Sequence, residues 1–559
     1  MRAVRASERA SVPFFSEPVF RAKTALTKSP CFLHFTTRRK PSHPIRSPTV
    51  TQRLLTATAP AKMLASIQHT ITLIQSSLDD PSIEWKKLVL ALLWLVYAFE
   101  TFLSLRQYRL YRLETPPATL ASHVDLATFK KSQVYGRDKA RFGFFSSVVS
   151  QLLSVALVYY DIYAWSWTLA GTILTSLGQS DAEIPRSIVW MVIMFVLREV
   201  PAMPLTLYRN FVIEERHGFN KMTLRTFVTD TLKEWLLGFV IGVPLISALL
   251  WIIRWAGSSF VSYVVLFLFS FQIIAMVLYP TVIQPLFNKL TPLPQGALRD
   301  RVVALASSLK FPLKHIYVID GSKRSSHSNA YFFGVIPGGN KHIVIFDTLI
   351  EKSSSDEIEA VLAHELGHYA NNDPTKLLVL SQVQIWFTMS LFTLFINNVS
   401  LYRSFGFQVG PSLLEKAAGT PSSQILNYLP IIIGLELFQL VLNPTDALIK
   451  FLLNSAIRRM EYAADHFAAT LSRPGPTPSE LSAAAEFNAE ESNAAAKVDP
   501  NQKEEYVDLL GKALIKLHVH NLSTMHHDPL FSAYHYSHPT LAERLNALQA
   551  LRPTLKKRA

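Results

Sequence analysis

The sequence predicts a mainly α-helical, polytopic membrane protein with seven transmembrane helices and a cytosolic α+β domain that binds a metal ion. Three observations lead to this fold class. Of the 559 residues, 49% are hydrophobic and only 17% are charged, a balance typical of chains that cross a bilayer. Seven apolar stretches are long enough, or nearly so, to span one. A metal-binding motif at 364–368 lies outside these stretches.

The seven predicted spans are placed by long apolar runs with few charges. In chain order they are 88–105, 142–163, 188–208, 235–255, 260–280, 377–396 and 425–442. The first five form a membrane region over 63–284 and the last two lie within 377–453. Ionisable groups in such segments should face protein or water instead of lipid; those within or beside the spans are Glu100, Arg198, Glu199 and Glu436. An alternative for Arg198 is an ion pair with Glu199.

Loop charge predicts the orientation, because short loops rich in Lys and Arg stay in the cytosol. Residues 106–141 contain eight Lys or Arg, and residues 209–233 contain five, so both loops are predicted to be cytosolic. Residues 164–187 carry only Arg186, and the turn after 255 is uncharged, so both are predicted to be lumenal. Alternation then places 281–376 and the C-terminus in the cytosol, and the N-terminus in the lumen.

The first 62 residues conflict with that topology. They are rich in Arg, Lys, Ser and Thr, with Glu8 and Glu17 as the only acids, and so basic a segment resists translocation. The composition is that of a mitochondrial transit peptide, but Met63 offers a start just before the first span, which favours an over-extended gene model. We expect 1–62 to be disordered or absent from the working protein. The sole cysteine, Cys31, lies there, which leaves His and carboxylates as metal ligands.

The stretch 364–368 reads His-Glu-Leu-Gly-His. On a helix, this spacing puts two imidazoles one turn apart on one face with a carboxylate beside them, as in a zinc site with its own general base. Ser354 and Glu357 have the spacing of a capping box before the motif, and Asn371–Pro374 should stop the helix after it. Two imidazoles leave zinc short of its usual three protein ligands.

The best candidate for the third ligand is Glu461, in a stretch rich in helix formers. Asp465 follows one turn later on the same face, where it is placed to orient a ligand imidazole. Such an E-x-x-x-D pair alone is more often a solvated helix face, and the upstream motif is what favours the metal site. The predicted domain is therefore split into 285–376 and 454–559, with a flexible insertion near 474–505.

Three further blocks match a known family. They are Phe211–Lys221 (FVIEERHGFNK), Gly321–Tyr331 (GSKRSSHSNAY), and His535–Pro539 continuing to Arg544. With 364–368 and Glu461 they extend over most of 64–550, and on these residues the chain resembles the type I CAAX prenyl proteases, integral-membrane zinc proteases of the endoplasmic reticulum and nuclear envelope. No Gly-rich phosphate loop or basic–aromatic alternation is present, so no nucleic-acid partner is expected.

The resemblance implies seven spans around a water-filled chamber, capped at the cytosolic end by a gluzincin-like zinc protease domain. It also implies one Zn²⁺ per chain. The implied site consists of the ligands His364, His368 and Glu461, the general base Glu365, and the oxyanion-stabilising pair His538 and Arg544. The implied partners are the lipid bilayer and prenylated protein or peptide C-termini, from which three residues are removed, with a second upstream cut in some precursors. The active site would be accessible from the cytosol.

Peptide positioning is expected from a small sheet beside the motif helix. The β-branched runs Ile316–Ile319 and Ile343–Phe346 predict two strands, with a further extended segment at Asn329, Ala330 and Tyr331. An edge strand there would pair with the substrate backbone. Two alternatives are a membrane quality-control zinc protease acting on unprenylated or translocon-stalled proteins, and a non-catalytic membrane scaffold.

Overall fold

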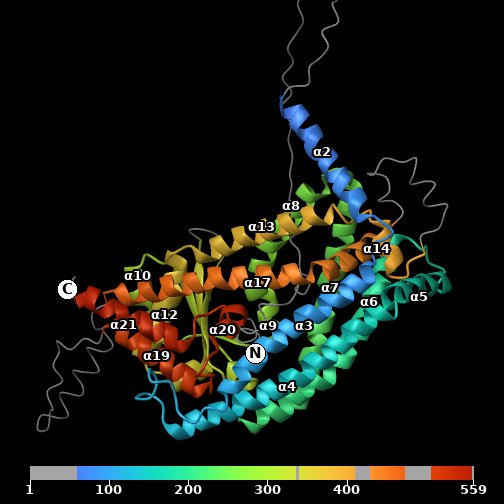
Figure 1. Cartoon of the computed structure of the whole chain (residues 1–559). Coiled ribbons are helices and arrows are strands. Elements are labelled where there is room, and N and C mark those ends of the chain that lie inside the picture. Colours follow the sequence, from blue (N-terminus) through green and yellow to red (C-terminus); the bar gives the residue numbers. More distant parts are fainter. Residues whose placement is uncertain (1–58, 335–338, 409–428, 473–504, 557–559) are drawn as a thin grey trace, which may run out of the picture.

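The computed structural model describes residues 59–334, 339–408, 429–472 and 505–556. This part of the chain is mainly helical and contains one four-stranded sheet, which confirms the predicted mainly α class. Long helices run along the molecule, and the sheet lies at one end with α10, α12, α19 and α21 around it (Figure 1). The insertion predicted at 474–505 lies outside the described residues except for Glu505, and so do the first 58 residues of the predicted leader.

The elements before the sheet are mostly long helices. They are α2 (Ala59–Leu78), α3 (Trp85–Leu110), α4 (Leu126–Tyr159), α5 (Ile162–Ser176), α6 (Glu183–Tyr208), η1 (Arg209–Glu214), α7 (Leu224–Ala256), η2 (Gly257–Ser259), α8 (Phe260–Leu278), η3 (Tyr279–Ile283) and α9 (Gln284–Phe287). Of these, η1 and η3 are π-helical turns and η2 is a 3-10 turn.

The sheet and the helices after it form the rest of the described chain. They are β1 (Leu290–Pro292), α10 (Ala297–Ser308), β2 (Leu313–Ile319), η4 (Gly321–Lys323), β3 (Ala330–Phe333), β4 (Lys341–Phe346), α11 (Asp347–Lys352), α12 (Ser355–Ala370), α13 (Asp373–Phe392), α14 (Val399–Ser404), α17 (Ile431–Thr470), α19 (Tyr506–His520), α20 (Pro529–His535) and α21 (Leu541–Lys556).

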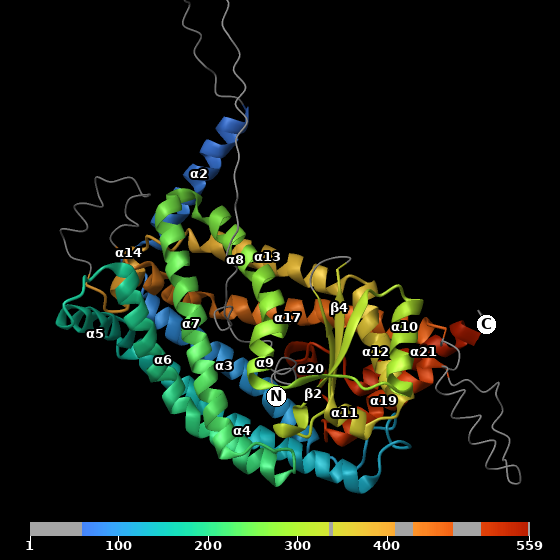
Figure 2. The ribbon, with the colours of Figure 1, turned by 180° about the vertical axis from the view of Figure 1, so that it is seen from behind.

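Five segments of the described chain are long and apolar enough to cross a membrane. They are Trp85–Leu110, Leu126–Tyr159, Glu183–Glu214, Leu224–Phe287 and Ile431–Thr470. The fourth includes the two long helices α7 and α8, which pack side by side (Figure 2). The predicted span at 377–396 lies mostly on α13, which is not among the five, and the one at 425–442 is described only from residue 429.

Two helix boundaries differ from the prediction. Helix α4 begins at Leu126, inside the predicted loop 106–141, because the Asp125 side chain caps it by accepting a hydrogen bond from the Thr128 amide. The connecting segment predicted at 164–187 contains most of α5 and the start of α6. Asp161, with φ at 55°, separates α4 from α5, so the chain turns there and continues as a helix.

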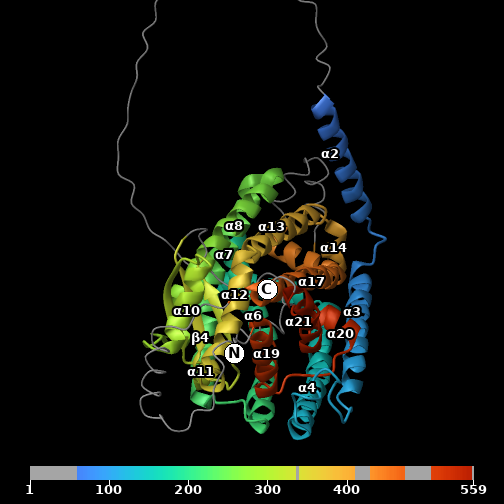
Figure 3. The same ribbon diagram turned by 90° about the vertical axis from the view of Figure 1, so that its left-hand side faces the viewer.

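The described residues form two large hydrophobic cores. One joins α3, α5, α6, α7, α8, α13, α14 and the first half of α17, around buried rings such as Phe392 and Phe438. The other joins the sheet to α10, α11, α12, α19 and α21. Leu120 and Phe129 from the predicted loop 106–141 belong to this second core. Figure 3 looks along the long helices and shows α12 close to α17.

The sheet has the strand order β1-β2-β4-β3, so β3 is an edge strand. β2 and β4 pair in parallel, and β3 pairs antiparallel to β4, with Ala330 opposite Ile345. These strands confirm the two predicted β-branched runs. Helix α12 packs against β3, so the edge strand lies beside the helix that carries the metal-binding motif.

A buried ion pair connects the loop 209–233 region to the segment that precedes β3. The Arg324 guanidinium donates to both carboxylate oxygens of Asp230, at 2.8 and 3.2 Å. Backbone contacts lie beside it: the Lys221 amide donates to the Arg324 carbonyl and the Ser326 amide to the Phe219 carbonyl. The position of β3 is thus linked to the membrane half of the chain.

Three of the four ionisable residues named in the predicted spans, Glu100, Arg198 and Glu436, have partners on other elements. Arg198 pairs with Glu436 instead of the neighbouring Glu199, and its guanidinium also donates to the Tyr163 hydroxyl. Glu100 accepts a hydrogen bond from the Tyr534 hydroxyl at 2.9 Å. The Arg198–Glu436 and Glu100–Tyr534 contacts each join residues more than 200 positions apart in the chain. A charge in an apolar layer needs such a partner to be stabilised.

We predict that Arg324→Met destabilises the protein by about 3–5 kcal/mol, because Asp230 is left buried without its cationic partner. The thermal unfolding midpoint of the detergent-solubilised chain measures this. Arg225→Met removes an exposed arginine from α7, the helix that carries Asp230, and should leave the midpoint unchanged. Equal midpoints for the two variants would contradict the role of the ion pair.

Candidate metal centre

Helix α12 carries the metal-binding motif. The predicted capping box is confirmed: the Ser354 hydroxyl accepts from the Glu357 amide at 3.3 Å, and the Glu357 carboxylate accepts from the Ser354 amide at 2.7 Å. The helix ends at Ala370, as predicted from Asn371–Pro374. The capping box fixes where the helix begins. Residues near the motif therefore determine that His364 and His368 lie on one face of the helix.

Three predicted ligands come together where α12 meets α17. The Nε2 atoms of His364 and His368 lie 3.4 Å from Oε2 and Oε1 of Glu461 respectively. The potential ligand atoms of the three residues all lie within 4.8 Å of one another. Tetrahedral zinc with bonds of about 2.0–2.1 Å needs ligand atoms about 3.3 Å apart. Glu461 is buried, and its Oε2 has no hydrogen-bond partner among the residues that the structure describes, so the donor set fits a zinc ion.

Gly367 permits this approach of the two helices. A Cβ atom at Gly367 would lie 3.0 Å from both Cα and the carbonyl oxygen of Ala464 on α17. Because backbone atoms cannot move aside as a flexible side chain can, any larger residue here would push α12 away from α17. The glycine between Leu366 and His368 therefore determines how close the imidazoles come to Glu461.

Asp465 lies behind His364, where it was predicted. Its Oδ1 is 2.9 Å from His364 Nδ1, which fixes Nδ1 as the protonated nitrogen and leaves the Nε2 lone pair facing Glu461. The buried guanidinium of Arg544 donates to both oxygens of Asp465, at 2.8 and 2.5 Å. Arg544 thus holds Asp465 in place, and it reaches the candidate metal site through Asp465 and His364.

Asp373 contacts the Nδ1 atom of His368, as Asp465 contacts that of His364. The sequence did not predict this contact. Its Oδ2 lies 2.9 Å from His368 Nδ1, and its Oδ1 accepts from Lys376. The sequence indicated only a helix stop at this point. Asn372 has φ at 55°, and this left-handed residue turns the chain so that Asp373 faces back toward the motif. The sequence feature that could have indicated this contact is an Asp five residues after a predicted ligand His.

His538 lies on the open side of the cluster. Its Nε2 is 3.2 Å from Glu461 Oε1, and its Nδ1 is 3.0 Å from the Ser537 hydroxyl. If the hydroxyl donates to Nδ1, then Nε2 carries the proton and can donate it to an anionic oxygen. Burial lowers the pKa of His538, although Glu461 opposes the shift, and this direction favours the neutral ring.

The charges around the motif shift the other titratable groups as well. Burial raises the pKa of Glu365, partly against the two imidazoles, which makes its carboxylate a stronger base. Burial opposes protonation of His368, but Glu461 and Asp373 outweigh it and raise its pKa to about 9. Burial likewise opposes protonation of His364, where Asp465 and Glu461 raise the pKa. The carboxylates thus favour positive charge on the two imidazoles.

The predicted substrate-binding residues lie at the edge strand. Asn329 precedes β3; its carbonyl accepts from the Phe346 amide and its side chain from the Ala330 amide. Ala330 is buried, and the Tyr331 hydroxyl contacts Gln284. The Asn329 side chain therefore caps the start of the strand through a contact within the chain.

Two family descriptions match consecutive parts of the chain. Residues 107–289 match "CAAX prenyl protease N-terminal, five membrane helices". Residues 292–552 match "Peptidase family M48". The boundary between the two falls at β1, so the second match contains β2, β3, β4, α12 and the whole of α17.

Curated relatives and a solved structure agree with these matches. The chain is 37% identical over 480 residues to CAAX prenyl protease 1 of Saccharomyces cerevisiae, covering 85% of this chain and 97% of the relative. It is 34% identical over 504 residues to the CAAX prenyl protease 1 homolog of Homo sapiens, covering 83% and 95%. The crystal structure of S. mikatae Ste24p superposes with a TM-score of 0.72 at 37% identity, covering 84% of this chain and 99% of that one.

We predict that Gly367→Ala reduces metal binding, because the added methyl group forces α12 away from Ala464 and separates the imidazoles from Glu461. Metal content by elemental analysis of the purified protein measures the loss. Gly511→Ala, in helix α19, is the matched control, since its Cβ would meet only Leu545 Cδ2 at 3.6 Å. That variant should keep its metal and gain up to about 1 kcal/mol from helix propensity. Full metal content in Gly367→Ala would contradict the steric argument.

Asp373→Asn and Asp465→Asn should each weaken metal affinity about 10–100-fold, because a neutral amide no longer fixes the ligand imidazole as a donor at Nδ1. Competition with a fluorescent zinc chelator measures the affinity. Asp125→Asn changes a carboxylate that caps α4 and should bind the metal normally. An unchanged affinity in Asp373→Asn would remove that residue from the site.

Proposed function

Because the chain belongs to the CAAX prenyl protease 1 family, we propose that it removes the C-terminal three residues of prenylated CAAX proteins in a zinc-dependent reaction. The chain is a multi-pass membrane metalloprotease. The observation that supports the proposed chemistry is the convergence of His364 and His368 with Glu461, at 3.4 Å from each imidazole. Some prenylated precursors would receive a second, upstream cut at the same centre.

In this proposal His364, His368 and Glu461 hold one Zn²⁺. When bound, zinc would supply Lewis acidity, lowering the pKa of a coordinated water to about 7 and polarising the scissile carbonyl. Asp465 and Asp373 keep both imidazoles protonated at Nδ1, so that both Nε2 atoms remain free as ligands. The protein thus supplies a preformed, oriented donor set.

Glu365 is the proposed general base. Its carboxylate takes a proton from the attacking water and later delivers it to the nitrogen of the leaving amine. Burial, which raises the pKa of Glu365, favours the first step, because a stronger base accepts the proton more readily. The second step is favoured by the leaving amine, which is a stronger base than the carboxylate.

His538 is the proposed donor to the developing oxyanion, through the proton on Nε2. In this tautomer the Ser537 hydroxyl, 3.0 Å from Nδ1, would donate to Nδ1 and so hold the ring. Arg544 supports the site from behind: it balances Asp465 and so maintains the orientation of His364. We therefore assign Arg544 a positioning role and His538 a catalytic one.

The substrate peptide is proposed to pair with the free edge of β3, beside α12. Backbone hydrogen bonds do not depend on the side chains of the substrate. This suits the CAAX motif, whose aliphatic positions vary. Ala330 and Tyr331 would provide the pairing edge, with Asn329 fixing its start. Because β3 is anchored by Arg324 and Asp230 to the membrane half, the peptide would lie in a fixed relation to the lipid.

The proposed setting is the endoplasmic reticulum membrane and the inner nuclear membrane. Seven spans would enclose a chamber, with the metal domain capping its cytosolic end and the C-terminus in the cytosol. A protein with one prenyl chain binds a bilayer only weakly and reversibly. Such a substrate could leave the bilayer readily and enter a site that is enclosed within the membrane protein. The quality-control alternative is less favoured, because the family matches extend over both the membrane half and the metal domain.

We predict that Glu365→Gln retains zinc but loses cleavage of a farnesylated CAAX peptide, by about 10²–10⁴-fold. The measurement is peptide release by the purified full chain, together with its metal content. A metal chelator should abolish cleavage by the wild-type protein, and added zinc should restore it. Cleavage that survives both treatments would disprove the mechanism.

The same peptide without its prenyl group tests the substrate class. We expect the unprenylated peptide to be cleaved far more slowly, because the lipid supplies part of the binding free energy. An unprenylated membrane protein serves as the quality-control substrate. Chelator-sensitive cleavage of that substrate alone would favour the quality-control function.

A further inference from the structure

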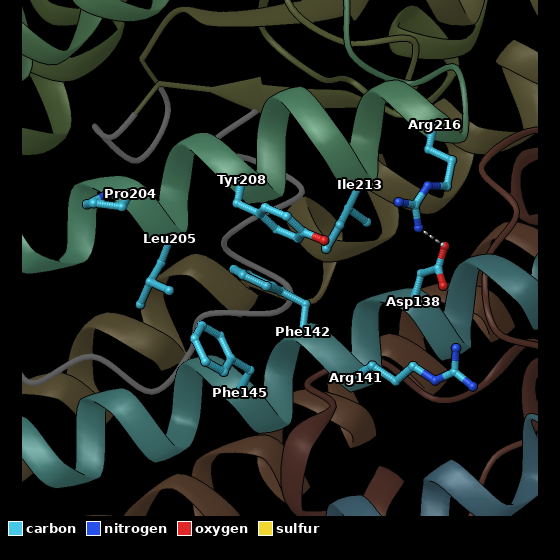
Figure 4. A pocket seen from close by; sticks show the side chains of 9 residues that line it. All are labelled: Asp138, Arg141, Phe142, Phe145, Pro204, Leu205, Tyr208, Ile213 and Arg216. Carbon is cyan, nitrogen blue, oxygen red and sulfur yellow. Dashed lines mark hydrogen bonds and ion pairs between the residues drawn. The ribbon is translucent and has the colours of Figure 1, made fainter.

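A cavity of about 620 Å³ lies between α4 and the end of α6, with η1 beside it. Figure 4 shows that its lining changes in character along its length. Arg141, Arg216 and Asp138 lie at one end. The stacked rings of Phe142 and Tyr208, whose centroids are 5.5 Å apart, lie in the middle. The other end is apolar, so the cavity is amphipathic.

The apolar end continues into exposed hydrophobic side chains on both helices. On α4, Phe145 is 60% exposed and Leu152 is 55% exposed, and they lie two turns apart on one face. On α6, Val196 and Val200 are also exposed and lie one turn apart. In a helix long enough to cross a membrane, such a face contacts hydrocarbon chains. The groove between the two helices thus leads from apolar surface to the arginines.

The polar end is fixed and carries an excess of positive charge. Asp138 accepts from Arg216 at 3.0 Å, and its carboxylate is also 3.0 Å from His217 Nε2. Arg141 donates through Nε to the Tyr108 hydroxyl at 3.1 Å. Each guanidinium has five N–H donors in a planar fork that matches a phosphate group. Two arginines and one aspartate leave this end cationic.

The surrounding loops favour an anionic lipid as the occupant. Residues 106–141 contain eight Lys or Arg and three acids, and residues 209–233 contain five and three. Both loops are predicted to be cytosolic, and the cytosolic leaflet is the one that carries anionic phospholipids. A phosphate at the arginines would place acyl chains along the exposed groove.

We propose that this cavity binds an anionic phospholipid of the cytosolic leaflet, with its phosphate at Arg141 and Arg216 and an acyl chain between α4 and α6. The site is separate from the metal centre, and its occupancy does not depend on peptide cleavage. A prenyl chain would use the apolar groove but has no phosphate for the two guanidiniums, which is why a phospholipid fits better.

The test is native mass spectrometry of the full chain, purified in detergent and titrated with phosphatidylglycerol or phosphatidylcholine. Phosphatidylglycerol should bind the wild-type protein, with phosphatidylcholine about tenfold weaker. The variant Arg141→Gln/Arg216→Gln should bind phosphatidylglycerol about tenfold more weakly. Lys131→Gln/Arg225→Gln removes the same charge from exposed positions of the same loops and should bind as the wild type does.

Two further measurements keep the outcome interpretable. The single variant Arg141→Gln changes an exposed side chain and should weaken phosphatidylglycerol binding severalfold. It tests the proposal even if the double variant does not fold. Inorganic phosphate should fail to displace the lipid, since it has no acyl chain to fill the groove. Equal binding by the site pair and the control pair would overturn the proposal, and so would displacement of the lipid by a farnesylated peptide.

Discussion

The contact between α12 and α17 at Gly367 and Ala464 is the constraint on which the candidate site depends. Two imidazoles one turn apart on a single helix provide only two ligands, and the third must come from another helix at backbone distance. A Cβ at Gly367 would meet the α17 backbone at 3.0 Å, so only glycine lets the helices come this close. The closeness in turn buries Glu461, Asp465 and His364 together.

Helix α17 carries that constraint into the membrane half. Its first residues, including Ile433 and Phe438, are buried in the core formed with α3, α7 and α13, while Ala464 and Glu461 face α12 some seven turns later. One continuous helix of 40 residues therefore belongs to both cores. Together with Arg324 and Asp230, it fixes the metal domain relative to the long apolar helices, and a substrate held in lipid would meet a site that does not move independently.

Local signals explain what the sequence predicted well. The cap at Ser354, the stop at Asn371 and the β-branched runs each depend on neighbours a few residues away, so their elements follow from propensity and spacing. Asp373 was missed because its orientation depends on the positive φ of Asn372. The sequence offered only Glu199 as an alternative partner for Arg198, because Glu436 is 238 residues away and only the tertiary fold brings the two side chains together. Helix α5 was missed because the turn at Asp161 needs an unusual backbone conformation.

The balance of charge explains why a cation belongs between these helices. Asp465 is matched by Arg544, and Asp373 is matched by Lys376, so the carboxylates that orient the imidazoles are each neutralised by a side chain. Glu461 differs, because the ion pairs described for it involve only the imidazoles of His364, His368 and His538. A buried carboxylate costs several kcal/mol unless positive charge compensates it. Protonated imidazoles supply that charge only by giving up the Nε2 lone pairs that bind a metal, whereas a divalent metal ion supplies it and leaves those lone pairs as ligands.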